Sequence, residues 1–202
     1  MNQSILRDRI LRALSLDTQY AERLEFLGGK PASVLICFAW STGSTEPSVL
    51  VVKRAHTGGP HSGQMAFPGG MSEPHEYGSD SGVVQTALRE TEEEVGILQG
   101  QVEVIGRLPR LTTLTGFDVT PVIGILMDPS EKVILRLDAD EIQEAIWIPW
   151  SVLTAPGSYR KEWITVEERR CPIHVYQVGP HRIWGATGSM IKNLLDRWDS
   201  LS

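Results

Sequence analysis

The feature that most constrains this chain of 202 residues is an amphipathic segment that ends at Gly96. Its apolar residues recur three and four positions apart, the spacing of one helix face: Val84, Ala87, Leu88, Thr91 and Val95. Asp80 or Ser81 is suited to begin the helix as its N-cap, and Gly96 is suited to end it in a left-handed conformation. A helix with one apolar face requires a second layer of structure to cover that face.

The same segment is strongly acidic. It carries four glutamates within five positions: Glu90, Glu92, Glu93 and Glu94. On a helix, Glu90, Glu93 and Glu94 share one face, whereas Glu92 projects elsewhere. Like charges at these spacings destabilise a helix unless solvent dilutes them or a cation neutralises them. A divalent cation with oxygen ligands, Mg²⁺ or Mn²⁺, is one interpretation, and a fully solvated face is the other.

Short apolar runs before and after this helix predict β-strands. The predicted strands lie at 34–40, 48–54, 64–67, 101–108, 119–126, 143–149 and 172–178. Further helices are predicted at 4–14 and from about residue 187, and the polar segment 71–81 is predicted to be loop. The strands do not alternate regularly with helices, which predicts an α/β fold with a mixed sheet and helices on its faces. We expect an N-terminal helical extension at 1–28, packed on one domain at 29–202.

Charge and hydropathy exclude several classes of protein. The net charge of −6 argues against broad nucleic-acid binding. No apolar run approaches the roughly 20 residues that span a bilayer, and no secretory signal pattern opens the chain. Cys37, within an apolar run, is predicted to be a buried free thiol, which favours a cytoplasmic protein. The N-terminal helix and the residues around Trp147 and Trp150 suit either a homodimer surface or the core.

A turn before the acidic helix completes a specific pattern. Phe67-Pro68-Gly69-Gly70, a polar loop and then Arg89-Glu90-Thr91-Glu92-Glu93-Glu94-Val95-Gly96-Ile97 resemble the Nudix box of the Nudix hydrolases. The resemblance implies a Nudix-type α/β/α sandwich with a mixed β-sheet. Within the box itself only Thr91 deviates from the pattern. A further departure lies upstream, where a family glutamate falls here at Ser81. Either that outer role is dispensable or another acid takes it: Asp80, Glu76 or Glu73.

The resemblance also implies a chemistry, the hydrolysis of a nucleoside diphosphate linked to another moiety. Glu90, Glu93 and Glu94 would hold one or more Mg²⁺ or Mn²⁺ ions, with help from a main-chain carbonyl near Gly70. Arg89 would orient the catalytic glutamates through ion pairs. The general base toward the attacking water would be Glu93 or a glutamate on a later loop.

The segment before the turn resembles a subfamily, the coenzyme A pyrophosphatases. The matching residues are Leu50-Val51-Val52-Lys53-Arg54-Ala55 and His61-Ser62-Gly63-Gln64-Met65-Ala66-Phe67-Pro68-Gly69-Gly70, and the likeness continues through 115–122 and 183–187. This resemblance implies that coenzyme A or its derivatives are the small nucleotide substrate, cleaved to 3′,5′-ADP and 4′-phosphopantetheine. The predicted substrate-binding residues are Arg54, Lys53, His61 and Phe67.

Two positions depart from the subfamily pattern. Gly59 stands where a second arginine is expected, and Val52 replaces a threonine. Arginine gives charge-assisted contacts to phosphate, so its loss leaves the substrate open, although Lys53, Arg54 or His61 could compensate. One alternative is a Nudix hydrolase of ADP-ribose or NADH. Another is a nucleotide-binding sensor without hydrolysis, which the three glutamates of the acidic face disfavour.

Overall fold

The computed structural model describes residues 3–15, 29–56, 58, 61–166 and 168–200. Two features singled out in the sequence, Gly59 and the boundary predicted after residue 28, lie outside these residues. The division into an extension and a domain therefore stays a prediction. No helix among the described residues is long and apolar enough to cross a membrane.

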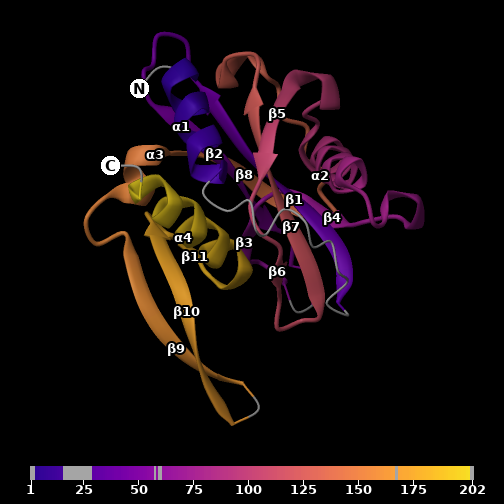
Figure 1. The fold of residues 1–202 in the computed structure, drawn as a ribbon, viewed down its shortest axis with the longest axis vertical. Coiled ribbons are helices and arrows are strands. Elements are labelled where there is room, and N and C mark those ends of the chain that lie inside the picture. Colours follow the sequence, from indigo (N-terminus) through magenta and orange to yellow (C-terminus); the bar gives the residue numbers. More distant parts are fainter. Residues whose placement is uncertain (1–2, 16–28, 57, 59–60, 167, 201–202) are drawn as a thin grey trace.

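A mixed sheet of eight strands forms the centre of the molecule (Figure 1). Its strands are β1 (Lys30–Trp40), β2 (Pro47–Arg54), β3 (Met65–Ala66), β4 (Gly69–Met71), β5 (Val102–Arg107), β6 (Leu111–Thr112), β7 (Phe117–Leu126) and β8 (Ile142–Pro149). The main path runs β3-β2-β1-β7-β5, with β4 beside β1, β6 beside β7 and β8 beside β2. The central pair, β1 with β7, is parallel, and the other pairs are antiparallel.

Helices cover both faces of this sheet. The first face carries α1 (Gln3–Ser15), α3 (Trp150–Thr154) and α4 (Gly185–Asp199), and the second carries α2 (Asp80–Val95). Strand β1 shows the division, because Ile36 and Phe38 belong to the first core while Leu35 and Cys37 belong to the second. Such alternation is what a strand buried on both faces requires. The predicted α/β/α sandwich with a mixed sheet is confirmed.

Helix α2 is built as its apolar spacing predicts. Ala87, Thr91 and Val95 are buried against the sheet, and Gly96 ends the helix at a φ of 75°. Its N-cap was predicted one or two residues too late, because Ser79 accepts the hydrogen bond from the backbone N–H of Gly82. The preceding segment is also not purely loop. It contains the short 3-10 helix η1 (Pro74–Glu76). Two further 3-10 helices among the described residues are η2 (Gln99–Gln101) and η3 (Ser130–Lys132).

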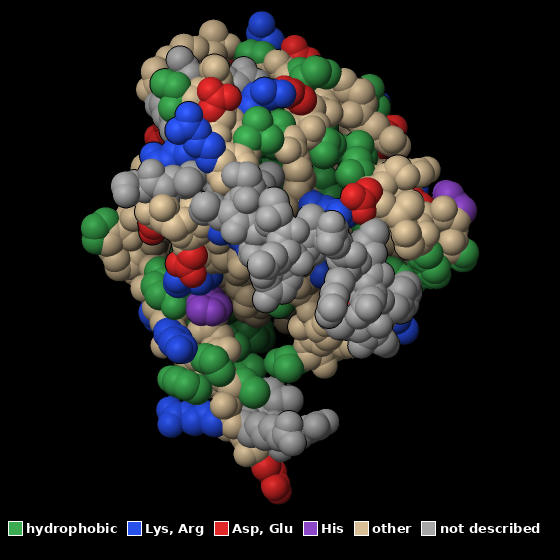
Figure 2. Space-filling view, viewed as in Figure 1, with side chains coloured by type: hydrophobic (Ala, Val, Ile, Leu, Met, Phe, Trp, Pro, Cys, Tyr) green, Lys and Arg blue, Asp and Glu red, His purple; other side chains and the backbone are tan. Residues whose placement is uncertain are grey.

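A second sheet, β11-β10-β9, was only partly predicted. It consists of β9 (Tyr159–Val166), β10 (Arg169–Val178) and β11 (His181–Ile183), of which the sequence indicated only 172–178. Three consecutive charged residues, Arg160, Lys161 and Glu162, conceal the strand β9 in the sequence. Figures 1 and 2 show the β9–β10 hairpin standing clear of the body, with basic and hydrophobic side chains along it.

The two tryptophans considered for a dimer surface belong to the core. The ring of Trp150 lies 5.5 Å from those of Phe38 and Trp198, measured between centroids. Trp147 packs against the core beneath α2, and Ile10 of α1 is fully buried in the first core. Core packing accounts for these residues, and the homodimer stays a prediction without support from them.

Candidate active site

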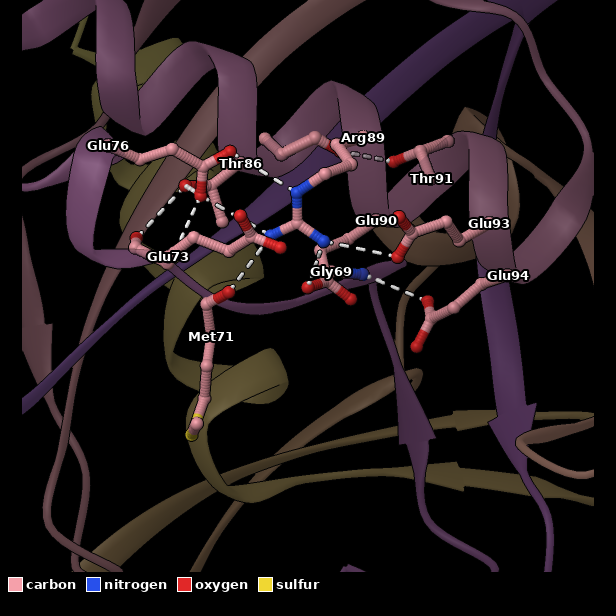
Figure 3. Close-up of polar contacts among 12 residues, drawn as sticks. Gly69, Met71, Glu73, Glu76, Thr86, Arg89, Glu90, Thr91, Glu93 and Glu94 are labelled. Atoms are coloured by element: carbon pink, nitrogen blue, oxygen red, sulfur yellow. Dashed lines mark hydrogen bonds and ion pairs between the residues drawn. The ribbon is translucent and has the colours of Figure 1, made fainter.

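The acidic face of α2 lies against the turn at the start of β4 (Figure 3). The backbone N–H of Gly69 donates to Oε2 of Glu94 at 3.0 Å. Gly70 lies so close to the helix that an added Cβ would stand 2.3 Å from Oε2 of Glu90. The turn is held here because β4 pairs with β1, with Gly69 opposite Val34. The two segments that the sequence pattern joined are therefore in contact.

Arg89 lies at the centre of a group of carboxylates (Figure 3). Its guanidinium donates to Glu90 at 2.8 Å, to Glu93 at 3.1 Å and to Glu76 at 3.2 Å. A further bond reaches the carbonyl oxygen of Met71 at 3.1 Å. These contacts raise the pKa of Arg89, led by the hydrogen bond to Glu76. Arg89 thereby ties the acidic face to the segment after β4.

Of the three acids considered for the outer position that falls at Ser81, Glu76 is the one that pairs with Arg89. Its side chain is completely buried, where it accepts from Thr86 Oγ1 at 2.8 Å and from the backbone N–H of Glu73 at 2.7 Å. Burial alone would raise its pKa, but these bonds and the Arg89 guanidinium outweigh burial and lower it. By contrast, Asp80 pairs with Arg107.

A local signal identifies Glu76 without the structure. Glu73-Pro74-His75-Glu76 places proline at the first position and glutamate at the third position of a short helix. Both are preferences of helix N-termini. Counting back from Arg89 reaches Ser81 instead, which left Glu76 as one of three candidate acids.

Burial dominates the charge state of the two inner glutamates. The side chain of Glu94 is 2% exposed, and burial raises its pKa to about 7 against the opposing effect of the Gly69 N–H and of Arg54. Burial also raises the pKa of Glu90, opposed by Arg89. Glu93 differs, because 58% of its side chain is exposed. Buried carboxylates stay ionised at neutral pH only beside a positive partner.

Arg54 reaches the acidic face from β2. Its Nη1 donates to Oε1 of Glu94 at 3.0 Å, and its Nη2 donates to Oε2 of Glu141 at 3.4 Å. The pairing of β2 with β8 shifts register between Lys53 and Arg54, and Arg54 pairs with Ile142 at the end of β2. Glu141 was not identified from the sequence, which allowed only for a glutamate on a later loop. It lies just before β8, and its charge acts on both Glu90 and Glu94.

The other predicted substrate-binding residues do not meet the acidic face. Among the described residues, no hydrogen bond or ion pair joins Lys53 to those carboxylates. His61 bonds to Gln64 at 3.3 Å and to Thr115 at 3.2 Å. Phe67 is 2% exposed and belongs to the first core. Core packing accounts for its side chain, and its role in substrate binding stays a prediction.

The donors of this face suit a hard divalent cation, which binds carboxylate and carbonyl oxygen. Glu90, Glu93 and Glu94 would hold it, with the main chain at Gly70. The fit rests on the buried carboxylate of Glu94 and on the space that Gly70 leaves for Glu90. Within the described part of the chain, no three acidic, histidine or cysteine side chains converge as a ready-made ion site. Arg89 and Arg54 draw the carboxylates toward themselves.

The two glycines of the turn are expected to respond differently to alanine. Gly69 has a φ of 150°, and its added Cβ would lie 2.3 Å from the carbonyl oxygen of Ser33, which cannot retreat. Gly69→Ala should therefore destabilise the fold by about 2 kcal/mol.

At Gly70 only the flexible Glu90 carboxylate must move, so Gly70→Ala should keep Tm and weaken Mn²⁺ binding about tenfold. Melting curves and Mn²⁺ titrations check this, and equal losses of Tm would contradict it.

Comparison with known proteins gives consistent results over most of the chain. A family model described as "NUDIX domain" matches residues 29–166. The "Uncharacterized Nudix hydrolase NudL" of Photorhabdus laumondii is 33% identical over 149 residues, 74% of this chain and 76% of that protein. The protein of the same name from Shigella sonnei is 33% identical over 183 residues, 90% of this chain and 84% of that one. The crystal structure of a MutT/nudix family protein from Enterococcus faecalis shares the fold, with a TM-score of 0.54 at 18% identity, covering 99% of this chain and 75% of that one.

Proposed function

The chain belongs to the Nudix hydrolase family, and we propose that it cleaves the diphosphate bond of coenzyme A or its derivatives with Mg²⁺ or Mn²⁺. The products would be 3′,5′-ADP and 4′-phosphopantetheine, free or acylated. One observation carries the proposal. Arg54, from the segment that resembles the coenzyme A pyrophosphatases, lies 3.0 Å from Glu94 of the acidic helix. The segment with the subfamily resemblance and the acidic helix are therefore in contact, which supports a common site.

The other segments with this resemblance gather around the same turn. His61 bonds to Thr115, and its ring lies 6.4 Å from that of Phe117 in an edge-on arrangement. Strand β11, which ends at Ile183, contacts β3 immediately before the turn. Three segments far apart in the sequence thus lie side by side. This arrangement supports a common role in substrate binding.

Each residue of the face has a chemical task in this proposal. A bound cation supplies neutralisation of the diphosphate and a lower pKa for its water. Glu90 and Glu94 supply the inner carboxylates, and Arg89 fixes Glu90 and Glu93 relative to each other. Glu93 has the exposed carboxylate and would take the proton from the attacking water. Arg54 would give a forked contact to phosphate oxygens.

A hydrolysis panel tests the proposal. With Mg²⁺, we expect coenzyme A or an acyl derivative to give the highest kcat/KM among coenzyme A, ADP-ribose, NADH and diadenosine polyphosphates. Glu93→Gln should lower kcat by about 10²- to 10⁴-fold, the usual contribution of a general base. Glu92→Gln, the same charge change on the same helix, is the matched control and should stay near wild type.

Other rankings would favour the alternatives. A higher kcat/KM for ADP-ribose or NADH would replace coenzyme A as the substrate but keep the reaction. Binding without turnover of any substrate would instead indicate a nucleotide sensor.

A cytoplasmic location is part of the proposal, supported by the free thiols of Cys37 and Cys171.

A further inference from the structure

Both carboxylate oxygens of Glu94 already have a donor. Oε2 accepts from the backbone N–H of Gly69 at 3.0 Å, and Oε1 accepts from Nη1 of Arg54 at 3.0 Å. Each oxygen keeps a second lone pair, but only 2% of the Glu94 side chain is exposed, so a cation that reaches it needs space that one of these two donors now occupies. They differ in how easily they can leave the carboxylate.

The Gly69 amide cannot move unless the sheet moves with it. Gly69 is buried, pairs with Val34 of β1, and has a backbone fitted against Ser33. Arg54 is a long side chain that is 31% exposed. Its main chain is fixed, because its N–H donates to the Gln64 carbonyl at 3.0 Å. Only the guanidinium of Arg54 is free to swing away.

Glu141 gives that guanidinium a second attachment. Nη2 of Arg54 donates to Oε2 of Glu141 at 3.4 Å, and the Glu141 side chain is 53% exposed. The backbone N–H of Ala55 also donates to the carbonyl of Glu141 at 2.7 Å, so the two residues stay together. Arg54 released by Glu94 would keep its charge at the rim of the site, with Nη1 available to a new acceptor.

We propose that Arg54 and the divalent cation are alternative partners of Glu94, and that cation binding passes Arg54 from Glu94 to a phosphate of the substrate. The inference rests on the proposed function, since it concerns the same face. Arg54 then weakens cation binding but strengthens substrate binding once the cation is present. Coupling of this kind is reciprocal, so substrate also strengthens cation binding.

Mn²⁺ titrations followed by electron paramagnetic resonance test this exchange in the full-length protein. Arg54→Gln removes the competitor, so the affinity for Mn²⁺ should rise about tenfold, in line with one charge-assisted hydrogen bond. The same variant should raise KM for the best substrate of the panel about tenfold. Opposite changes in the two affinities distinguish exchange from a general loss of structure, which would weaken both.

Two matched variants separate the possible failures. Lys53→Gln removes the same charge one position earlier on β2. If it strengthened Mn²⁺ binding as much as Arg54→Gln does, the loss of any positive charge would explain the effect, and the exchange would be overturned. Glu94→Gln should abolish the tight Mn²⁺ site. Loss of binding in Glu94→Gln together with unchanged or weaker binding in Arg54→Gln overturns the exchange alone. Unchanged binding in Glu94→Gln overturns the metal face and the proposed function with it.

If a variant fails to fold, a measurement on the unmodified protein still tests the exchange. Crystals grown with Mg²⁺ should show Nη1 of Arg54 more than ~4 Å from Oε1 of Glu94, beyond ion-pair distance. A separation that stays at about 3 Å with Mg²⁺ bound, the length of a direct hydrogen bond, would overturn the exchange.

Discussion

Replacing Glu94 by glutamine is expected to lower kcat by about 10³-fold, the upper range for loss of one electrostatic group in an active site. The protein in chelator should nevertheless lose no stability. Glu94 is almost completely buried, and burial raises its pKa to about 7 from an ordinary 4.5. Glutamine keeps the acceptor for the Gly69 N–H and removes the buried charge. Turnover with Mg²⁺ and melting curves in chelator measure the two effects.

The sign of the pH dependence follows from that raised pKa. The folded chain holds a proton on Glu94 that the unfolded chain has released, so wild-type stability falls as the pH rises from about 4.5 to about 7. Glu94→Gln lacks this loss. Its Tm advantage over wild type in chelator should therefore grow between pH 5 and pH 8. An advantage that does not change with pH, or equal loss of turnover in the control Glu92→Gln, would contradict this account.

Removing the Arg89 guanidinium should have the largest effect on stability. Arg89→Met leaves the fully buried Glu76 without its cation and frees Glu90 and Glu93 from their common partner. Breaking a buried ion pair from one side costs about 3 kcal/mol or more. For a chain of this length we expect a fall of about 10 °C in Tm. Turnover should fall as well, because the two carboxylates lose their fixed separation.

A second substitution separates these two losses. In Arg89→Met with Glu76→Gln, no buried charge is left unpaired, so much of the Tm should return while turnover stays low. Arg7→Met is the surface control, because Arg7 and its partner Glu103 are both exposed, and exposed pairs contribute little. Recovery of turnover together with Tm in the double variant would show that Arg89 acts only through stability.

Local periodicity was enough to predict the acidic helix. The spacing of Ala87, Thr91 and Val95 places these residues on one face of a helix. The positive φ at Gly96 follows from the need to end that helix. The sequence also placed Gly69 and Gly70 near the glutamates, through resemblance. Periodicity does not give the side-chain geometry, because which arginine each carboxylate meets depends on contacts across the sheet.

Three features that local sequence patterns did not indicate depend on such contacts. Glu141 is far from α2 in the sequence and reaches the face only through the pairing of β2 with β8. Phe67 lies in the core because the turn after it rests on β1, although its neighbours in the sequence suggested a substrate contact. Strand β9 carries charges on consecutive residues, so its sequence lacks the alternation that marks a half-buried strand.

The parallel pairing of β1 with β7 has a consequence for how the site comes into being. Its register runs from Lys30 opposite Phe117 to Phe38 opposite Ile125, so it closes a long loop of chain. That loop contains β2, the glycine turn and the whole of α2. Closing it costs chain entropy before any contact across it is gained, which makes it a late and cooperative step of folding. The glutamates and the turn are therefore assembled together with the central sheet, and the site has no independent folding unit of its own.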